Sequence, residues 1–440
     1  MSVQDLRGWL DKVDARGGLV QVDGADWDLE LGSIYWLSSE RRPGPALLFD
    51  RIKGYPPGYR VLTNALQDPD NVALTLDMPL GLSMSEYAKR WRQRYASLPL
   101  IRPTHVSTGP VMENVHEGND VNVLEFPAPL WHEKDGGRYI GTNSITITVD
   151  PDEGWVNVGT YRVMVHDEKT VSFYLDYGRD AYIQREKYFA RGLPCPVAIS
   201  LGHDPLLFTV ASIPLPRGVS EYEYAGGIRG EPVEVIRGPV TGLPIPAFSE
   251  IVLEGVAVPG DSRPEGPFGE WTGYYGSGMR EEPVIQVKAI YHRNNPIILG
   301  NAPLPPQTSS QYAYGFMRSA LILDELVKAG IPDVMGVSAH PAAGASQMVA
   351  VSIKQRFPGH ARQAGMIAAL CHAVTCNARY VIVVDDDIDV HNWNQVIWAM
   401  NTRSDPVNDV EIVRRCWGGP LDPAIPTEEK GLHSRCIIDA

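Results

Sequence analysis

The chain has 440 residues, of which 44% are apolar and 21% charged, and a formal net charge of −14. A chain of this length is too long for one hydrophobic core, which predicts two or three domains. The acidic excess argues against a nucleic-acid-binding surface, which needs clustered Lys and Arg. No window approaches the roughly 18 consecutive apolar residues of a membrane span, and residues 1–18 lack the pattern of a signal peptide. The five scattered cysteines suit a reducing compartment. We therefore expect a soluble, cytoplasmic protein.

Residues 1–105 mix helical and strand patterns and are predicted to form an N-terminal α/β domain. Residues 2–18 indicate an amphipathic helix that stops at glycine, and residues 45–52 (PALLFDRI) indicate a strand. Residues 83–99 indicate a second helix, which is ended by proline.

Residues 106–305 change to an apolar period of two, which predicts an antiparallel sheet or barrel because no long helical pattern separates the strands. Within this stretch, residues 156–176 indicate a hairpin that turns at 166–169. Asn157 and Arg162 are an odd number of residues apart and would face opposite ways on an ideal strand, so Gly159 is a candidate bulge that realigns them.

The helical period returns after residue 305. Residues 306–330 are expected to form a linking helix, with Ser309 as its N-cap and an end at Gly330. Residues 331–440 place an apolar strand (378–384) after a helix (359–377) and predict a C-terminal α/β domain, to which we assign oligomerisation.

The predicted strand is followed directly by a run of five residues, Asp385 to Asp389, four of which are aspartates. Acids at the carboxyl end of such a strand often bind a metal or a nucleotide in α/β proteins. They leave open a magnesium-dependent nucleotide-sugar or phosphoryl transferase, although no glycine-rich phosphate loop accompanies them.

The segment Pro264 to Trp271 (PEGPFGEW) holds the two most informative carboxylates, Glu265 and Glu270. Two prolines and two glycines constrain the backbone, and aromatic residues flank the acids. A carboxylate beside aromatic surface is partly desolvated, which raises its pKa and suits proton transfer near neutral pH. A structural turn with solvated acids is the alternative interpretation of this pattern.

Two other charged residues are candidates for the same site. Arg162 lies in an otherwise apolar stretch, and a buried arginine is normally paired with a carboxylate that its fork can grip in two places. An exposed strand face is the alternative. Glu221 follows a proline-rich loop, where a solvated surface position is the simpler explanation.

Several ordered segments together resemble the UbiD family of reversible decarboxylases, which use prenylated FMN. The segments are NVGTYR (157–162), SEYEYAGGIRGEPVEV (220–235), SEIVLEG (249–255) followed by PEGPFGEWTGYY (264–275), YHRNNPI (291–297) and DDDIDVHNWNQVIWAMNTR (385–403). The resemblance covers nearly the whole chain. It implies that residues 106–305 form a split β-barrel, of the FMN-reductase-like type, that binds the flavin and carries the catalytic residues.

The resemblance also implies roles for individual residues. Arg162, Glu265 and Glu270 match the family's catalytic network, in which Arg162 would grip the substrate carboxylate and be polarised by Glu265. Glu270 would protonate the carbon after CO₂ leaves. The prenylated flavin would act as the electron sink, so the protein supplies position and charge.

Other positions match the family's cofactor and metal contacts. By resemblance, a divalent metal, Mn²⁺ or Mg²⁺, would bridge to the flavin phosphate, and a monovalent cation, K⁺ or Na⁺, would lie beside the flavin. The matching residues are Asn157 and Glu221 for the divalent metal, Ala211, Ser212 and Ile213 for the flavin and the monovalent cation, and Arg435, where the family commonly has a phosphate-binding lysine.

The sequence departs from the family pattern in two places. The family usually supplies a histidine as third metal ligand, and the corresponding position here is Tyr177, whose neutral phenol is a poor manganese ligand. The neighbouring Asp176 suits a hard cation, so we expect Asp176 or water to complete the site. The chain also ends soon after Arg435, short of the C-terminal segment of many relatives, so we expect other residues to close the pocket.

The substrate is predicted to be a monocarboxylic aromatic or heteroaromatic acid of the indole, pyrrole, phenazine or phenol type. Residues 301–314, with Leu304, Tyr312 and Tyr314, are expected to form a substrate wall that lacks an obvious Arg or His for a second carboxylate. A decarboxylase of α,β-unsaturated, cinnamate-type acids and a non-catalytic flavin-binding paralogue remain alternatives. The resemblance further implies a flavin prenyltransferase that supplies the cofactor and a homo-oligomer, either a dimer or a hexamer.

Overall fold

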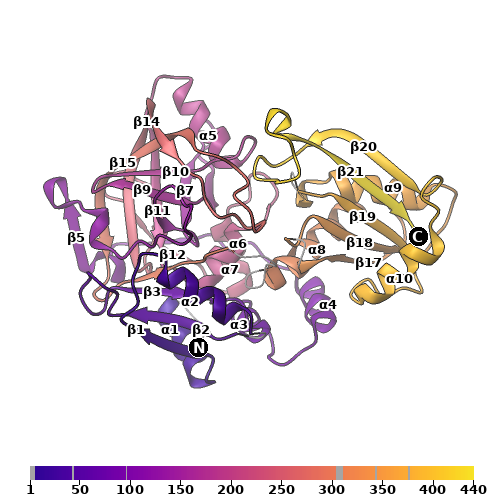
Figure 1. The fold of residues 1–440 in the computed structure, drawn as a ribbon, viewed down its shortest axis with the longest axis horizontal. Coiled ribbons are helices and arrows are strands. Elements are labelled where there is room, and N and C mark those ends of the chain that lie inside the picture. The colour runs from indigo at the N-terminus through magenta and orange to yellow at the C-terminus, as the bar shows by residue number, and fades with distance from the viewer. Residues whose placement is uncertain (1–4, 42–43, 96, 304–310, 342–343, 375–376) are drawn as a thin grey trace.

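The computed structural model describes residues 5–41, 44–95, 97–303, 311–341, 344–374 and 377–440. It confirms the mixed α/β class of the fold. Figure 1 shows the N-terminal and central parts packed together on one side and the C-terminal part on the other, with helix α8 between them. Across the described ranges, no helix is both long and apolar enough to cross a membrane.

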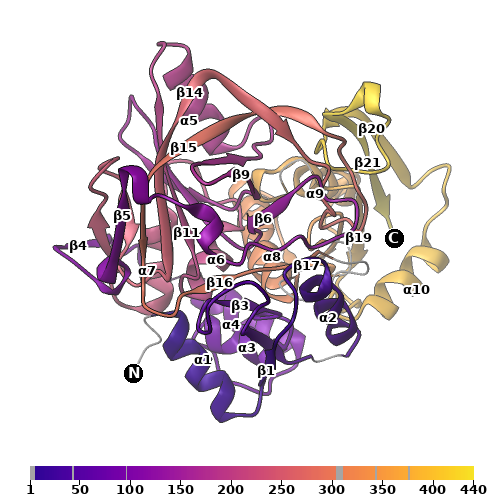
Figure 2. The same cartoon turned by 60° about the vertical axis from the view of Figure 1, so that its left-hand side comes forward.

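A four-stranded sheet in the order β1-β2-β3-β16 organises the N-terminal part (Figure 2). Its strands are β1 (Leu19–Asp23), β2 (Ala46–Asp50), β3 (Arg60–Thr63) and β16 (Ile297–Leu299), and its helices are α1 (Leu6–Ala15), α2 (Glu30–Ser39), α3 (Pro69–Thr75) and α4 (Met84–Tyr95). Helix α1 begins at an Asp5 cap and buries the apolar stripe that the sequence predicted, including Trp9. Because β16 comes from the end of the central part, its pairing with β3 ties the two parts together.

A nine-stranded sheet forms the central part, in the order β6-β9-β10-β15-β14-β11-β7-β8 with β5 paired to β15. Every pairing in it is antiparallel, as the period of two predicted. The strands are β5 (Asn114–Glu117), β6 (Arg138–Gly141), β7 (Ile145–Val149), β8 (Val156–Gly159), β9 (Val163–Asp167), β10 (Thr170–Phe173), β11 (Cys195–Leu201), β14 (Ile251–Glu265) and β15 (Arg280–His292).

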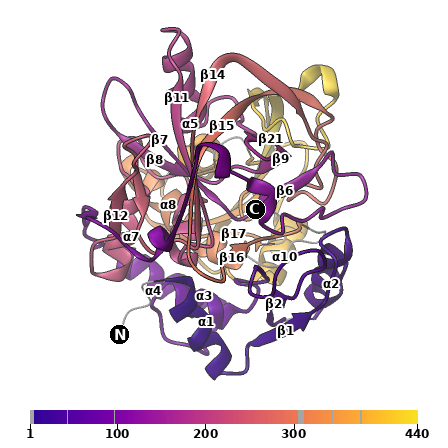
Figure 3. The same ribbon diagram turned by 90° about the vertical axis from the view of Figure 1, so that its left-hand side faces the viewer.

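The connections of this sheet require it to curl. Strands β6 and β7, and likewise β8 and β9, lie six positions apart in the sheet order, a span of about 29 Å if the sheet were flat. Yet only residues 142–144 and 160–162 join them, and three residues can bridge no more than roughly 14 Å. The sheet therefore closes on itself as a split barrel, and both short connections cross its seam. Figure 3 shows β7 and β8 on one side of this sheet and β6 and β9 on the other.

The seam corrects one local prediction. The hairpin with its turn near 166–169 is confirmed as β9 and β10. However, Asn157 and Arg162 do not share a strand with a bulge at Gly159, because β8 ends at Gly159 and pairs with β7, whereas β9 begins at Val163 and pairs with β6 and β10. Arg162 instead lies on the crossing between the two edges of the sheet.

Smaller elements cover the central sheet. Helix α5 (Asp180–Phe189) packs beside β7 and β8, and α6 (Pro205–Ala211) packs against α7 (Glu221–Arg229). A separate three-stranded sheet consists of β4 (Thr104–Val106), β12 (Glu234–Arg237) and β13 (Pro244–Pro246). Short 3₁₀ helices include η1 (Pro110–Glu113), η2 (Gly118–Asp120), η3 (Val123–Glu125), η5 (His372–Val374) and η6 (Thr427–Glu429).

The C-terminal part is a five-stranded sheet in the order β17-β18-β19-β21-β20, reached through α8 (Gln311–Lys328). Its elements are β17 (Val334–Ala339), β18 (Met348–Ile353), α9 (His360–Leu370), β19 (Tyr380–Asp385), α10 (Trp393–Arg403), β20 (Val410–Trp417) and β21 (Leu432–Asp439). Helix α8 lies where the linking helix was predicted, but the serine expected as its N-cap lies outside the described residues. Helix α9 ends earlier than the sequence pattern predicted.

The acidic run after β19 is held by local contacts. Asp387 forms a two-point ion pair with Arg403, at 2.8 and 2.6 Å, and Asp389 accepts a hydrogen bond from the backbone N–H of His391 at 2.9 Å. These contacts fix the turn that leads into α10. The run lines neither of the two cavities described below.

Candidate active site

The structure brings Arg162, Glu265 and Glu270 together. Arg162 donates from Nε to Glu265 Oε1 at 2.8 Å and from Nη2 to Glu265 Oε2 at 2.7 Å, a two-point charge-assisted pair. Its remaining nitrogen, Nη1, donates to Glu270 Oε1. The strand β14 ends at Glu265 and the loop after it carries Glu270, whereas Arg162 enters from the seam crossing.

Aromatic rings enclose this ion cluster. The Arg162 guanidinium lies 4.0 Å from the centroid of the Tyr174 ring and 5.4 Å from that of Phe268. Tyr139 donates from its hydroxyl to Glu265 Oε1 at 2.9 Å, and burial together with the charge of Glu265 raises the pKa of this phenol. Burial alone would lower the pKa of Arg162, but the hydrogen bonds and the charge of Glu265 outweigh burial. The pKa is therefore raised overall and the guanidinium stays charged.

The two carboxylates are not equivalent. Glu265 is fully buried, and its oxygens already accept two bonds from Arg162 and one from Tyr139. Glu270 lines the adjoining cavity, whereas Glu265 does not. Within the described ranges, the only hydrogen bond to the Glu270 carboxylate comes from Arg162. The environment thus fixes Glu265 in place and leaves Glu270 facing the space where a ligand would lie.

Close backbone packing holds the loop that carries these acids. Gly136 donates from its N–H to the Pro267 carbonyl at 2.7 Å, and a Cβ at Gly136 would lie 2.0 Å from the Gly266 carbonyl oxygen. The N–H of Gly269 donates to Asp135 Oδ1 at 2.9 Å. The 135–136 segment therefore fits the loop only with glycine at 136, because any side chain there would displace the backbone next to Glu265.

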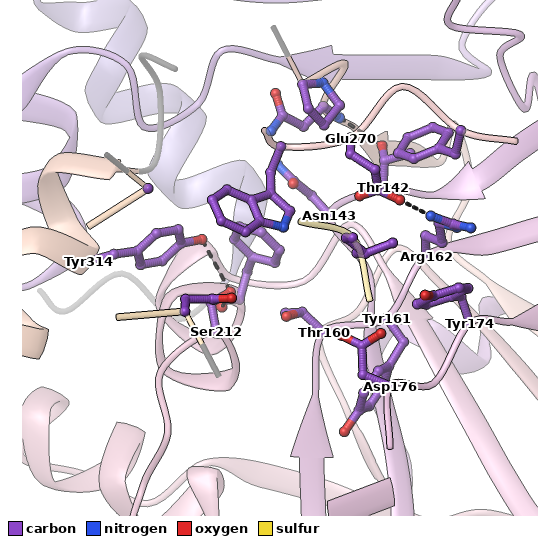
Figure 4. A pocket seen from close by; sticks show the side chains of 18 of the residues that line it. Thr142, Asn143, Thr160, Tyr161, Arg162, Tyr174, Asp176, Ser212, Glu270 and Tyr314 are labelled. Atoms are coloured by element: carbon purple, nitrogen blue, oxygen red, sulfur yellow. Dashed lines mark hydrogen bonds and ion pairs between the residues drawn. The ribbon is translucent and has the colours of Figure 1, made fainter. Parts of the chain in front are cut away.

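A cavity of about 260 Å³ opens beside Glu270, between the central and C-terminal parts. Figure 4 shows Arg162, Tyr174 and Glu270 on one side of it and Ser212 and Tyr314 on the other. The central part contributes the seam residues 142–143 and 160–162, and the C-terminal part contributes Gly344, Asn377 and Leu421. Closure of the cavity thus depends on both parts of the chain.

The predicted substrate wall is only partly within the described residues. Tyr314 lines the cavity, and its hydroxyl donates to Ser212 Oγ at 3.1 Å. Leu304 lies outside the described residues, as does the side chain of Tyr312. Two arginines that the sequence reasoning missed, Arg179 and Arg318, also line the cavity.

A second, smaller cavity adjoins the first. Thr160, Tyr161, Arg179 and Ser212 line both of them. Asn157 and Glu221, the predicted metal ligands, line the second cavity, and so do all three residues predicted to line the flavin, Ala211, Ser212 and Ile213. The structure therefore brings five of the predicted metal and cofactor residues, Asn157, Glu221 and residues 211–213, together beside the catalytic trio.

Glu221 lies deep in this second cavity at the first residue of α7. Burial raises the pKa of Glu221 to about 8, although its Oε2 accepts a hydrogen bond from the Val158 N–H at 2.8 Å. No ion pair joins Glu221 to a cationic side chain in the part of the chain that the structure describes. A buried carboxylate without a cation is costly, so this position suits a bound positive charge.

Asp176 and Tyr177 lie apart from Asn157 and Glu221. Asp176 lines the first cavity beside Arg162, and burial raises the pKa of its carboxyl. Tyr177 is 63% exposed. Asp180 lines the second cavity instead, near enough to Glu221 for its charge to raise the pKa of that carboxyl further. The sequence offered no signal for Asp180, because it opens a helix whose position only the fold determines.

Arg435 lies on β21, where it is buried and donates to the Trp417 carbonyl at 3.0 Å. Trp417 lines the second cavity, whereas Arg435 does not. The predicted contact between Arg435 and a phosphate therefore stays a prediction.

The fold and the site place a buried arginine and a neighbouring acid beside a cavity, an arrangement that can hold an anionic group and move a proton. Three family models match the chain: the N-terminal domain of 3-octaprenyl-4-hydroxybenzoate carboxy-lyase at residues 10–91, its Rift-related domain at 103–306 and its C-terminal domain at 311–440. The chain belongs to the UbiD family, as its motifs indicated, and is therefore a carboxy-lyase, a decarboxylase.

Characterised relatives match along the whole chain. A pyrrole-2-carboxylic acid decarboxylase of Pseudomonas aeruginosa is 33% identical, and the match covers 100% of this chain and 91% of that protein. A phenolic acid decarboxylase of Sedimentibacter hydroxybenzoicus is 34% identical, with 99% and 91% covered.

Solved structures agree with these relatives. The closed form of the S. hydroxybenzoicus vanillic acid decarboxylase superposes with a TM-score of 0.93 at 32% identity, covering 100% of this chain and 92% of that one, whereas its open form gives 0.85. The structure of this chain is therefore more similar to the closed form of that enzyme than to its open form. HmfF from Pelotomaculum thermopropionicum, solved in complex with FMN, gives 0.84 at 28% identity, covering 99% and 93%.

Proposed function

We propose that this chain catalyses the non-oxidative, reversible decarboxylation of an aromatic or heteroaromatic monocarboxylic acid with prenylated FMN as cofactor. The observation that carries the proposal is the buried Arg162 held by Glu265 at two points, with Glu270 beside it on the wall of the cavity between the central and C-terminal parts. The pyrrole- and phenol-type acids named for the relatives support a ring-attached carboxylate as the substrate group.

Arg162 is proposed to hold the substrate carboxylate. Glu265 fixes the orientation of the guanidinium and keeps it charged, so the arginine offers a rigid donor to an incoming anion. The Tyr174 ring under the guanidinium limits its movement. Because the guanidinium is buried, a carboxylate that binds it exchanges water for a cation whose position is already fixed.

Glu270 is proposed to be the proton donor. When the bond between the ring carbon and the carboxylate breaks, CO₂ leaves and the electron pair stays with the carbon, which then needs one proton. Of the two acids, only Glu270 lines the cavity, so its carboxyl can deliver that proton and can take it back in the carboxylation direction.

The residues present fit a flavin with a phosphate tail and a divalent cation. The two adjoining cavities provide a larger space near Arg162 and a smaller one lined by Ala211, Ser212 and Ile213. Arg179 lines both and is placed to meet an anionic phosphate, so we add it to Arg435 as a candidate phosphate contact. When bound, the prenylated flavin supplies the electron sink for the charge that develops at the ring carbon.

The oxygen ligands of the smaller cavity suit a hard cation such as Mn²⁺ or Mg²⁺. We propose Asn157, Asp180 and Glu221 as ligands, with Asp180 in the role that the sequence gave to Asp176. A monovalent cation beside residues 211–213, a prenyltransferase that supplies the flavin and a homo-oligomeric state complete the proposal.

Asp180→Asn is therefore expected to lower bound manganese at least tenfold, whereas Asp176→Asn retains it, because only Asp180 shares a cavity with Asn157 and Glu221. The manganese content of both gel-filtered variants is measured by mass spectrometry, and their flavin absorbance is recorded alongside, so no activity assay is needed. Loss of metal in Asp176→Asn with retention in Asp180→Asn would reverse the assignment.

The proposed reaction is tested with a panel of acids and a CO₂-release assay. The protein is coexpressed with a flavin prenyltransferase and offered pyrrole-2-carboxylate, indole, phenazine and phenolic carboxylates, and cinnamate. We expect turnover of at least one acid whose carboxylate is attached to the ring. Turnover of cinnamate alone would favour the α,β-unsaturated class, and no turnover with cofactor fully loaded would favour a non-catalytic paralogue; either result overturns the proposal.

A further inference from the structure

A second group of metal-binding side chains lies at the outer edge of the central sheet. One ligand atom from each of His116, Glu125 and His292 falls within 4.8 Å of the other two. His116 lies on β5, Glu125 ends the short helix η3, and His292 ends β15. Figures 1 and 2 place β5 at the outer side of the central part, away from the C-terminal sheet that borders the catalytic cavity.

The register of two strands creates this group. Strands β5 and β15 are antiparallel, and His116 lies directly opposite Ile290. His292 is two residues further along β15 and so projects from the same face of the sheet as Ile290. Diagonal neighbours of this kind remain within reach of long or aromatic side chains, which brings the two imidazoles to a ring-centroid distance of 5.0 Å.

The orientation of His292 is fixed by the backbone. Its Nδ1 lies 2.9 Å from the Arg293 carbonyl oxygen, which can only accept, so Nδ1 carries the proton. Nε2 of His292 therefore presents a lone pair, and this nitrogen is 3.3 Å from His116 Nε2 and 3.8 Å from Glu125 Oε1. Metal-binding histidines commonly show this arrangement, in which the second ring nitrogen donates to a carbonyl.

The protons of the cluster do not satisfy its acceptors. A neutral His116 has one N–H, which can point at His292 Nε2 or, from Nδ1, at Glu125 Oε1, 3.4 Å away, but not at both. In the described part of the chain, Glu125 Oε1 is buried and accepts no hydrogen bond. Three electron-rich atoms therefore converge with too few protons between them, and a divalent cation would satisfy all three.

The ligand types indicate which cation. Two imidazoles and one carboxylate are typical of zinc, whereas oxygen-only sets suit manganese and magnesium. The 3.3 Å between the two Nε2 atoms equals the edge of a tetrahedron with metal–nitrogen bonds of about 2.0–2.1 Å. The side chain of His292 is 5% exposed and those of His116 and Glu125 are 27% and 21% exposed, so the site is open to solvent on one side.

We propose that His116, Glu125 and His292 bind a zinc-like divalent cation, with water in the fourth position, separately from the site at Asn157 and Glu221. The cation would join the 114–125 segment to the edge of β15. Because binding favours the folded state only, it would also stabilise the protein against heat.

The test uses tag-free protein stripped of metal and then saturated with Mn²⁺. Zn²⁺ is titrated by equilibrium dialysis, and Co²⁺ is substituted for it to report tetrahedral coordination by its visible absorption. We expect wild type to bind one equivalent of Zn²⁺ more than His116→Ala and Glu125→Gln, with at least about 100-fold weaker binding in each variant. Zn²⁺ should raise the Tm of wild type and not of the variants.

The matched control is His105→Ala, which removes an exposed histidine outside the cluster and should bind Zn²⁺ as wild type does. His116 and Glu125 are chosen because they are partly exposed, so their variants are expected to fold even if a variant at the buried His292 does not. Equal zinc stoichiometry in wild type, His116→Ala and Glu125→Gln would overturn the proposal.

Discussion

Glu270→Gln is expected to lower kcat by about 10²–10⁴-fold while leaving the flavin bound. Glutamine keeps the shape of the side chain and can still accept the Arg162 hydrogen bond, but it cannot give a proton to the ring carbon. Glu270 lines the cavity and Glu265 does not, so Glu265 cannot replace it as the donor. Steady-state CO₂ release and flavin absorbance of the same preparation measure the two effects.

The control for this variant is Glu281→Gln, which removes an exposed carboxylate from the neighbouring strand β15 and should leave kcat unchanged. A Glu270→Gln enzyme that retains near-normal kcat would refute the proton-donor role. Loss of flavin from that variant would instead assign Glu270 to cofactor binding.

Arg162→Lys is expected to lower kcat/KM by about 10²–10³-fold. Lysine keeps the positive charge but not the planar fork, so the two-point pair with Glu265 and the contact with Glu270 cannot form together. Losing charge-assisted hydrogen bonds worth about 1.5–3 kcal/mol each accounts for a decrease of this size. The buried Glu265 would be poorly paired, so the variant should also lose about 1–3 kcal/mol of unfolding free energy.

Arg263→Lys provides the matched control on β14. Arg263 pairs with Asp167 at 2.6 Å in a partly exposed position, where an ion pair contributes little to stability. Kinetics and chemical denaturation of both variants should separate them clearly. If Arg162→Lys stays within about threefold of wild type in kcat/KM, the guanidinium does not grip the carboxylate as proposed.

The sequence predicted the parts of the site that depend on local patterns. The constrained segment around Glu265 and Glu270 was readable because its prolines, glycines and aromatic residues are contiguous. The antiparallel central sheet was readable from its period of two, and α1 from its apolar stripe. These features need only neighbouring residues to be recognised.

The remaining parts depend on how distant segments meet. Arg162 reaches Glu265 because the sheet curls and the short 160–162 connection crosses its seam. No local sequence pattern indicates that one strand ends before residue 160 and that the next belongs to the other edge of the sheet. Tyr139, which donates to Glu265, resembled any aromatic residue of a buried strand. Asp180 was missed for the same reason, because the relevant distance is to Glu221 on another helix.

The measurement that tests the central claim most directly compares CO₂ release by the same chain produced with and without a flavin prenyltransferase. Mass spectrometry of the released cofactor accompanies the assay, with the best acid of the panel as substrate. The account predicts prenylated FMN bound to the protein, turnover of a ring-attached carboxylate by that preparation, and no turnover by the preparation without it. Equal turnover by both preparations, or no flavin in the coexpressed protein, would contradict the account.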